Sequence, residues 1–262
     1  EHNLYPLRYN KTVAEITKKT TGDSIIWARS AWAGSQRYPL HWGGDAETTD
    51  SAMAATLRAG LSLGLCGFSF WSHDIGGFAQ QSPGELYRRW LAFGMFTSHS
   101  RCHGIPPKEP WAYGRAFMVE FRRTVELRYR LMPYIYAQAK LSSKEGWPLM
   151  RTLFFDFPGD PVCWTVEDEY LFGSDMLIAP LLENSRKRKV YLPAGKWIDY
   201  QSGQIYEGVK WHEIQACGVP IIILVKNGSA IPHIKLAQST KDLDWENLEL
   251  MLFSADKPGT GQ

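Results

Sequence analysis

The chain has 262 residues, enough to bury a substantial core as one barrel or as two smaller domains. Its 29 basic and 27 acidic side chains nearly cancel, and the only dense basic run, Arg186–Lys189, is typical of a solvated turn, so we expect no nucleic-acid partner. No apolar stretch reaches the roughly 18 residues of a membrane-spanning helix, so we expect no membrane partner.

The first part of the chain alternates helical and strand patterns. Pro6–Lys19 is predicted to be helical, because proline comes early and apolar residues are spaced between Arg and Lys. A second helix is predicted to run to about Gly64, capped by Asp50 and Ser51, and a third to start with Ser82 as its cap. Short buried strands are predicted at Ile25–Ala28, Tyr38–Trp42, Gly67–Trp71 and Phe93–Thr97.

Polar residues follow each of these predicted strands, namely Arg29, Asp45, Asp74 and His103. Strands that alternate with helices predict a parallel sheet with crossover connections. Four such strands with polar carboxyl ends fit half of a (β/α)₈ barrel. A doubly wound sheet fits less well, because no glycine-rich phosphate loop follows a first strand.

In the rest of the chain the spacing of the apolar residues changes from a helical to a strand-like period. A long helix is predicted over about Arg115–Leu141, with Pro133 either kinking it or marking the join of two helices. From Met150 on, short strands separated by turns predict an antiparallel β-sandwich, interrupted by a small helix over Val166–Phe172. The strand candidates are Leu149–Phe155, Met176–Ala179, Lys189–Leu192, Trp197–Tyr200, Ile221–Val225 and a last one at Leu248–Phe253.

These patterns predict an α/β chain in three parts. Residues 1–147 form the second half of a (β/α)₈ TIM barrel, and residues 148–228 form a proximal β-sandwich domain. Residues 229–262 start a further, incomplete distal β domain. Both ends of the chain suggest a piece cut from something longer, so the absence of a targeting signal is uninformative.

Two aspartates in glycine-rich segments are candidates for chemistry. Asp45 follows two glycines and lies near Trp42, and a carboxyl beside an aromatic wall can act as a general acid. A turn aspartate explains the same residues equally well, and Asp74 has the same two explanations. Arg29 is harder to explain structurally, because a buried strand rarely ends in arginine without a carboxylate or a ligand to pair with it.

Other reactive side chains support weaker hypotheses. His99, Cys102 and His103 suggest a metal site, but no fourth ligand stands at a fitting spacing, so we expect no metal. No G-x-S-x-G elbow supports a serine hydrolase. The dispersed cysteines weakly favour the cytoplasm. Arginine and aspartate near Trp and His at one rim suit a neutral, polyhydroxylated ligand, and the 11 Trp residues agree with sugar binding as well as with core packing.

Several motifs together resemble one enzyme family. Residues 29–45, RSAWAGSQRYPLHWGGD, resemble the general-acid segment of glycoside hydrolase family 31, the α-xylosidase and α-glucosidase family. Residues 72–78, SHDIGGF, and 98–104, SHSRCHG, resemble two more of its motifs in the same order. Residues 170–180 resemble the family's entry into its sandwich domain. The similarity covers nearly the whole chain and weakens beyond about Ile231.

The resemblance implies a role for each matching residue. Asp45 matches the catalytic acid/base of a retaining mechanism that needs no metal or organic cofactor. The residues that match the lining of the subsite for the non-reducing sugar are Arg29, Trp42, Asp74, Phe78 and His103. The substrate is then an oligosaccharide or α-glycoside, and the full-length protein a possible homo-oligomer. A retaining enzyme also needs a nucleophilic carboxylate about 5–5.5 Å from the acid, and its motif is expected upstream of Glu1.

The absence of the nucleophile motif from this sequence leads to a further expectation. Half a barrel has two open sheet edges, so we expect that the isolated chain does not turn over substrate. It then belongs to a longer polypeptide, pairs with a partner, or is a truncated product. The residues Ala31–Trp32 and Pro39–Gly44 resemble the α-xylosidase branch of the family more than the α-glucosidase branch. The alternative from another class is a non-catalytic carbohydrate-binding remnant that lacks the nucleophile.

Overall fold

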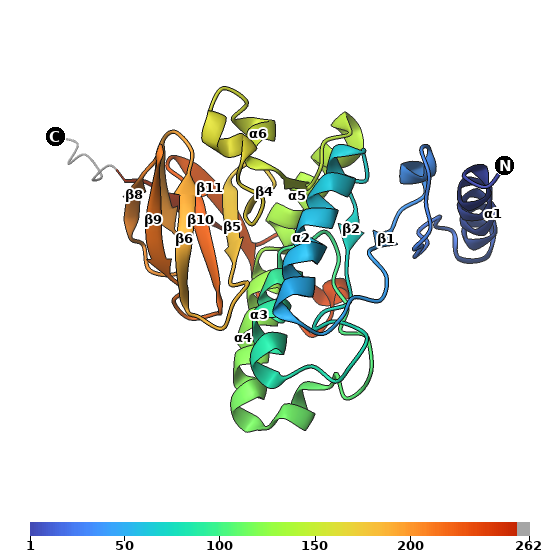
Figure 1. Cartoon of the computed structure of the whole chain (residues 1–262), viewed down its shortest axis with the longest axis horizontal. Coiled ribbons are helices and arrows are strands. Elements are labelled where there is room, and N and C mark those ends of the chain that lie inside the picture. Colours follow the sequence, from blue (N-terminus) through green and yellow to red (C-terminus); the bar gives the residue numbers. More distant parts are fainter. Residues whose placement is uncertain (256–262) are drawn as a thin grey trace.

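The computed structural model describes residues 1–255, and Figure 1 shows three parts along its long axis. The first helix, α1 (Leu4–Thr21), lies at one end and the antiparallel strands lie at the other. Between them are the helices α2 (Asp50–Leu65), α3 (Gly84–Met95), α4 (Arg115–Arg130) and α5 (Met132–Glu145). Short 3₁₀ turns are η1 (Ser35–Arg37), η2 (Pro110–Tyr113), η3 (Pro161–Trp164) and η4 (Thr240–Asp242). No helix within residues 1–255 has the length and apolar character needed to span a membrane.

The parallel part of the fold is made of very short strands. β1 (His41–Trp42) pairs in parallel with β2 (Trp71–Ser72), and single parallel bridges join Ala28 to His41 and Asp74 to Arg101. The backbone N–H of Ala28 also donates to Leu40 O at 2.9 Å. The predicted part of a (β/α)₈ barrel is therefore confirmed, with strands shorter than expected.

One predicted strand of the barrel is wrong. Phe93–Thr97 is not a strand, because α3 continues through Met95. Leu86, Trp90 and Phe93 are buried along this helix, and every residue of its last turns, Arg89–Met95, is buried as well. A helix that is buried nearly all round shows no polar face, so its end resembles a short buried strand in the sequence. The parallel bridge is made further along, by Arg101.

The helix starts differ slightly from the predicted caps. Thr49, rather than Asp50 or Ser51, caps α2 by accepting the N–H of Ala52 at 3.1 Å. Ser82 does not cap α3, since its hydroxyl donates to Gly76 O at 2.5 Å instead. The predicted join near Pro133 is confirmed: α4 ends at Arg130 and α5 begins at Met132, with the proline in its first turn.

The antiparallel part is a sandwich of a large and a small sheet. The six-stranded sheet has the order β3-β4-β5-β10-β7-β8, and a two-stranded sheet pairs β6 with β9. The strands of the large sheet are β3 (Met150–Arg151), β4 (Tyr170–Phe172), β5 (Met176–Pro180), β10 (Ile221–Lys226), β7 (Lys196–Asp199) and β8 (Ile205–Glu207). The small sheet contains β6 (Lys187–Leu192) and β9 (Lys210–Gln215). This confirms the predicted antiparallel β domain.

Two local predictions in this part are wrong. The strand expected over Leu149–Phe155 is limited to Met150–Arg151, and α6 (Leu153–Asp156) follows it. The helix expected over Val166–Phe172 does not form: its last residues, Tyr170–Phe172, are β4, which pairs with β3 and β5, and the residues before them belong to no helix or strand. All residues of β4 are buried, so they lack the alternation that identifies a strand in the sequence.

A final hairpin follows the sandwich. β11 (Ser229–Ile234) pairs antiparallel with β12 (Leu248–Phe253), which is the last predicted strand. The predicted distal domain extends to residue 262, and its residues 256–262 lie outside the described part. The domain limits at residues 147 and 228 stay predictions.

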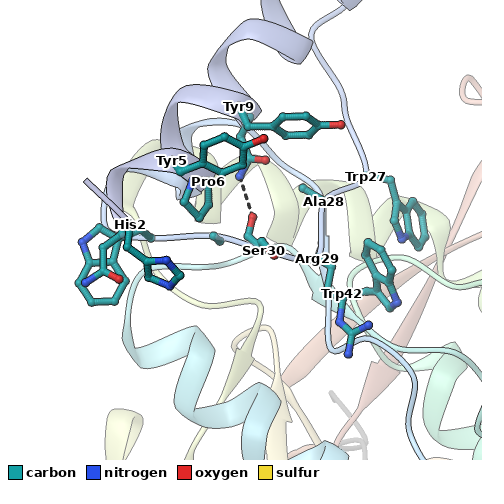
Figure 2. Close-up of a pocket in the computed structure, with 13 residues that line it drawn as sticks. His2, Tyr5, Pro6, Tyr9, Trp27, Ala28, Arg29, Ser30 and Trp42 are labelled. Carbon is teal, nitrogen blue, oxygen red and sulfur yellow. Dashed lines mark hydrogen bonds between the residues drawn. The ribbon is translucent and has the colours of Figure 1, made fainter.

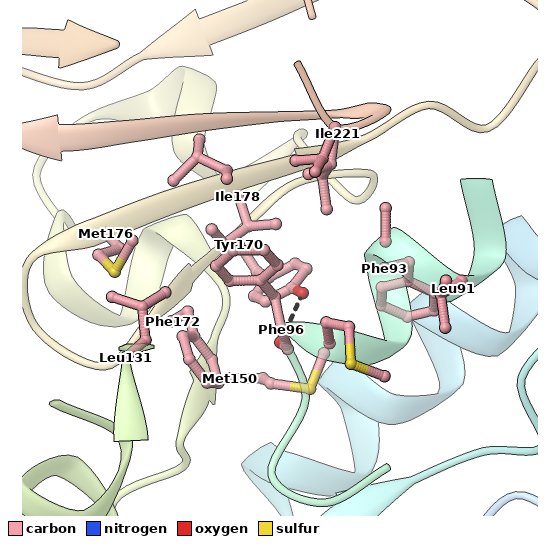
Figure 3. Close-up of a cluster of buried hydrophobic side chains, with 14 of the residues drawn as sticks. Leu91, Phe93, Phe96, Leu131, Met150, Tyr170, Phe172, Met176, Ile178 and Ile221 are labelled. Carbon is pink, nitrogen blue, oxygen red and sulfur yellow. Dashed lines mark hydrogen bonds between the residues drawn. The ribbon is translucent and has the colours of Figure 1, made fainter. Parts of the chain in front are cut away.

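A shared core joins the barrel helices to the sandwich. Figure 3 shows Phe93 and Phe96 at the end of α3 packed towards Tyr170 and Ile178 of the large sheet. Tyr170 also donates its hydroxyl to Phe96 O at 2.7 Å. The sandwich therefore fixes the end of α3, from which the chain continues to residues 98–103 of the predicted site.

Candidate active site

The polar ends of the parallel segments meet at one rim. The N–H of Trp42 donates to Ala28 O at 3.3 Å, and the N–H of Gly43 donates to Ser72 O at 3.1 Å. The N–H of Ile75 donates to Arg101 O at 3.2 Å. Since these bonds hold neighbouring strand ends side by side, the side chains that follow them face a common space, as at the active-site rim of a (β/α)₈ barrel.

Asp45 and Arg29 form one charged pair of this rim. Arg29 Nη1 lies 3.7 Å from Asp45 Oδ2, and both side chains are about half exposed, at 56% and 48%. Gly44 permits this arrangement, because its φ is +80° and a Cβ there would lie 2.3 Å from Arg29 Nε. The Asp45 carboxylate is therefore accessible to a ligand and lies beside a cation.

Asp74 and Arg101 form the second pair, which is buried. Arg101 donates from Nε at 2.8 Å and lies with Nη2 at 2.7 Å from the same oxygen, Asp74 Oδ1. The other oxygen, Oδ2, is buried and has no hydrogen-bond partner among the described residues. Burial raises the pKa of Asp74, Arg101 and His103 oppose this, and the negative charge of Asp45 adds to it. Asp74 therefore holds the Arg101 guanidinium at the rim, while its second oxygen is enclosed by protein.

Aromatic rings surround the buried pair. The Arg101 guanidinium lies 4.7 Å from the ring centroid of Trp27 and 4.9 Å from that of Trp42. The rings of Phe78 and His103 lie 5.5 Å apart. These rings give the rim an apolar wall, and the C–H faces of a sugar ring are suited to such a surface.

A tight turn links the predicted residues to one another. Gly76 and Gly77 both have positive φ, +87° and +74°, which allows the chain to reverse between Asp74 and Phe78. Phe78 then donates its N–H to Ala46 O at 2.8 Å and accepts the N–H of Ile105 at 2.9 Å. The turn therefore touches the segment after Asp45 and the segment after His103.

All the residues predicted for the site lie at this rim. Arg29 pairs with Asp45, Trp42 and Asp74 both contact Arg101, and Phe78 lies against His103. Sequence reasoning missed Arg101 and Trp27. Trp27 stands two residues before Arg29, the spacing that places strand side chains on one face, and Arg101 stands within the quoted segment SHSRCHG.

Two histidines next to the rim have lowered pKa values; His73 is buried and His99 is half-buried. Burial, with the charge of Arg128, lowers the pKa of His99 to about 3, and its ring bonds to Ser98 Oγ at 2.8 Å. Burial also lowers the pKa of His73 to about 3. No group of at least three His, Cys, Asp or Glu side chains positioned for a metal ion occurs within residues 1–255. The geometry therefore gives no support to the metal hypothesis for His99, Cys102 and His103.

A cavity of about 700 Å³ lies between α1 and residues 27–32. Figure 2 shows Arg29 and Trp42 near one end of it and Tyr5 and Tyr9 of α1 near the other. Asn10 of α1 donates to Ser30 O at 3.1 Å across this space. The cavity was not predicted from the sequence, and it adjoins the free side of the segment that carries Arg29.

The whole arrangement can be compared with known proteins. Residues 1–138 match the family model of the glycosyl hydrolases family 31 TIM-barrel domain, and residues 146–231 match that of the glycosyl hydrolase family 31 C-terminal domain. The chain therefore belongs to glycoside hydrolase family 31. The resemblance predicted from residues 29–45, 72–78, 98–104 and 170–180 is confirmed.

Similar family 31 proteins include an alpha-xylosidase from Emericella nidulans, which is 40% identical over 96% of this chain and 34% of its own length. An alpha-glucosidase 2 from Bacillus thermoamyloliquefaciens is 35% identical over 97% of the chain and 33% of its own length. A solved alpha-xylosidase from a soil metagenome, complexed with xylose, is 35% identical with a TM-score of 0.83 over 87% of this chain and 38% of that one. The chain spans about a third of the length of these curated relatives.

Proposed function

We propose that the chain is the carboxyl-terminal portion of a retaining α-glycoside hydrolase that releases terminal α-linked xylose from oligosaccharides. The observation that carries the proposal is the half-exposed Asp45 carboxylate, 3.7 Å from Arg29 and at the same rim as the buried Asp74. In this proposal Asp45 is the general acid and base. A single accessible carboxylate beside a sugar-sized polar rim is what such a role requires.

The other rim residues would hold the non-reducing sugar. Arg29 and His103 can donate hydrogen bonds to sugar oxygens, and the buried Asp74 holds the Arg101 guanidinium at the rim. Trp42 and Phe78 supply apolar surface for the ring.

The second carboxylate of the pair would come from outside this chain. In the first step it attacks the anomeric carbon, the bond to the leaving oxygen breaks, and Asp45 transfers its proton to that oxygen. In the second step Asp45 takes a proton from water as the water displaces the carboxylate. Asp74 fits this role poorly, because it is fully buried and bound to Arg101. The cavity beside Ala28 offers room for a further strand that brings the nucleophile to the rim.

Xylose is chosen as the substrate on two grounds, the similarity of the chain to its relatives and the residues of one of its motifs. The alpha-xylosidase relative is 40% identical and the alpha-glucosidase relative 35%. The residue pair Ala31–Trp32 favours the same choice. Release of glucose by the same mechanism is the alternative.

The test compares the 262-residue chain with an extended protein, defined as the chain plus the residues encoded immediately upstream of Glu1. Both are assayed on aryl α-xyloside and aryl α-glucoside, and the first-formed anomer is identified by NMR. We expect the extended protein to hydrolyse the xyloside faster and with retention, and the chain alone to bind xylose without turnover.

Each contrary result would overturn a different part of the proposed function. Turnover by the chain alone contradicts an external nucleophile. Faster hydrolysis of the glucoside makes the protein an α-glucosidase. Sugar binding without turnover by the extended protein makes it a non-catalytic carbohydrate-binding protein.

A further inference from the structure

Lys108 is a buried lysine next to the site. It is 7% exposed, and its Nζ donates to Gly77 O and to Ser82 Oγ, both at 2.7 Å. The ammonium lies 5.5 Å from the ring centroid of Tyr87, whose hydroxyl donates to Lys108 O at 2.7 Å. Within residues 1–255, Lys108 forms no ion pair with a carboxylate at 4 Å or less, which is unusual for a buried lysine.

One of the two groups that Lys108 Nζ binds, Gly77 O, belongs to the turn that follows Asp74, and the other, Ser82 Oγ, lies just before α3. Ser82 passes the contact on, because its hydroxyl donates to Gly76 O at 2.5 Å. Both carbonyls of the Gly76–Gly77 pair are thus held by one network that ends on Lys108. This is the turn that reverses the chain between Asp74 and Phe78 with two positive φ angles.

The loop that carries Lys108 packs closely against the same turn. A Cβ at Gly104 would lie 2.7 Å from Gly77 O, 2.9 Å from Phe78 Cα and 2.9 Å from Lys108 Cε. The loop therefore approaches the turn without space for another side chain, and the ammonium fastens it there. His103 precedes this contact by one residue, so the same attachment also bears on its position.

The charge of Lys108 bears on the site as well. Burial lowers the pKa of this lysine, while the charges of Cys102 and Asp74 act in the opposite direction. The Asp74 carboxylate therefore has the Arg101 guanidinium in direct contact and the Lys108 ammonium behind the turn.

We propose that Lys108 is a positioning residue for the sugar subsite, which it serves by locking the Gly76–Gly77 turn so that Asp74, Phe78 and His103 keep their places. This inference rests on the proposed function and extends it to a residue that does not touch the sugar. A purely structural lysine would lower stability when removed but would leave the affinity for sugar unchanged.

The test uses Lys108→Met, which keeps the length of the side chain and removes the donor, and Lys108→Ala, which leaves space for an added alkylammonium ion. Leu131→Ala is the matched control, since Leu131 is a buried residue, 1% exposed, at the end of α4 and belongs neither to the turn nor to the hydrogen bonds of Lys108. For each variant we measure xylose affinity of the 262-residue chain by tryptophan fluorescence, and kcat and KM of the extended protein on aryl α-xyloside.

Lys108→Met is expected to weaken xylose binding and to raise KM by about tenfold, with a smaller change in kcat, because a charged donor to two site-forming oxygens is lost. Added propylammonium should restore part of the affinity of Lys108→Ala. Amide exchange at Gly77 and Phe78 should accelerate in both variants. The control should lose stability and keep wild-type affinity.

Wild-type affinity and KM in Lys108→Met would overturn the inference, and so would an equal loss of affinity in Leu131→Ala. Absence of turnover by the wild-type extended protein would overturn the catalytic part of the proposed function, and the xylose titration and amide exchange would then still decide the role of Lys108. Absence of xylose binding by the wild-type chain would overturn both proposals.

Discussion

The barrel part and the sandwich of this chain are held together in different ways. In the sandwich, β10 runs through the middle of a six-stranded sheet, and its residues Ile221–Val225 are fully buried apolar side chains. In the barrel part, the paired strands β1 and β2 contain two residues each, and Asp74, His73 and Lys108 are buried. The centre of the large sheet therefore depends on apolar burial, and the barrel rim on polar contacts to its loops.

Three cations illustrate this difference at the rim. Arg101 binds the Asp74 carboxylate, and Lys108 binds the turn that follows it. Arg128 of α4 donates to Met95 O at 2.6 Å, to Thr97 O at 2.8 Å and to Ser98 O at 3.0 Å. Cations therefore fix the loops of the site, whereas the cation Lys187 of the sandwich pairs with Glu213 at an exposed position.

The largest expected effect comes from breaking the buried pair at the rim. Arg101→Met leaves Asp74 as a buried carboxylate without its partner, so we expect a loss of about 3–5 kcal/mol in the free energy of unfolding and no measurable xylose binding. Lys187→Met is the control, because it breaks an exposed pair and should cost less than about 1 kcal/mol. Urea unfolding and xylose titration measure both. Similar losses in the two variants would contradict the distinction between the two regions.

The next effect separates stability from binding. Leu224→Ala removes a fully buried side chain from the centre of the large sheet and should lower the free energy of unfolding by about 3 kcal/mol. Xylose affinity should stay at the wild-type value, because Leu224 packs with Leu177 and Trp197 in the inner core of the sandwich and not in the core shared with α3. Ile205→Ala, at a position that is 48% exposed, is the control and should have little effect. A parallel loss of sugar affinity in Leu224→Ala would show that the two regions are not independent.

The smallest effect concerns acid stability and belongs to the barrel part. His73 has a pKa of about 3 in the folded protein against 6.5 as its ordinary value, so it is neutral when folded. As the pH falls below 6.5 the unfolded chain gains a proton that the folded chain lacks, and stability decreases until the folded pKa is reached. Between about pH 6.5 and pH 5 this amounts to about 2 kcal/mol.

His73→Phe should remove this part of the pH dependence, as measured by urea unfolding at about pH 7 and about pH 5. Trp90→Phe, next to His73 in the same core, is the control and should keep the wild-type dependence. An unchanged slope in His73→Phe would mean that His73 is already protonated in the folded protein.

The sequence predicted the fold well where patterns were distinctive. The alternation of helices with polar-ended strands gave the barrel part, and short strands with turns between them gave the sandwich. Predictions failed where burial was complete. Phe93–Thr97 was assigned the wrong state, and so was Tyr170–Phe172 within the helix expected over Val166–Phe172, because a run buried on all sides carries no period that separates helix from strand.

The position of the candidate site could be predicted because the proposed residues stand in short, ordered motifs. Asp45, Asp74 and His103 could be placed at one rim from the rule that parallel strands end at the same edge. Trp27, Arg101 and Lys108 were missed, because their importance comes from contacts between segments distant in the chain. Lys108 touches Gly77 and Ser82, 31 and 26 residues away, and nothing in its own neighbourhood in the sequence indicates that it is buried.

The most direct test of the central claim is rescue of Asp45→Ala by azide in the extended protein. With an aryl α-xyloside that carries a good leaving group, the variant should still form the covalent intermediate but hydrolyse it slowly, because no base activates water. Azide needs no base, so it should restore turnover and yield α-xylosyl azide, which NMR identifies. Full hydrolytic activity of Asp45→Ala, or no azide product, would contradict the role of Asp45 as acid and base.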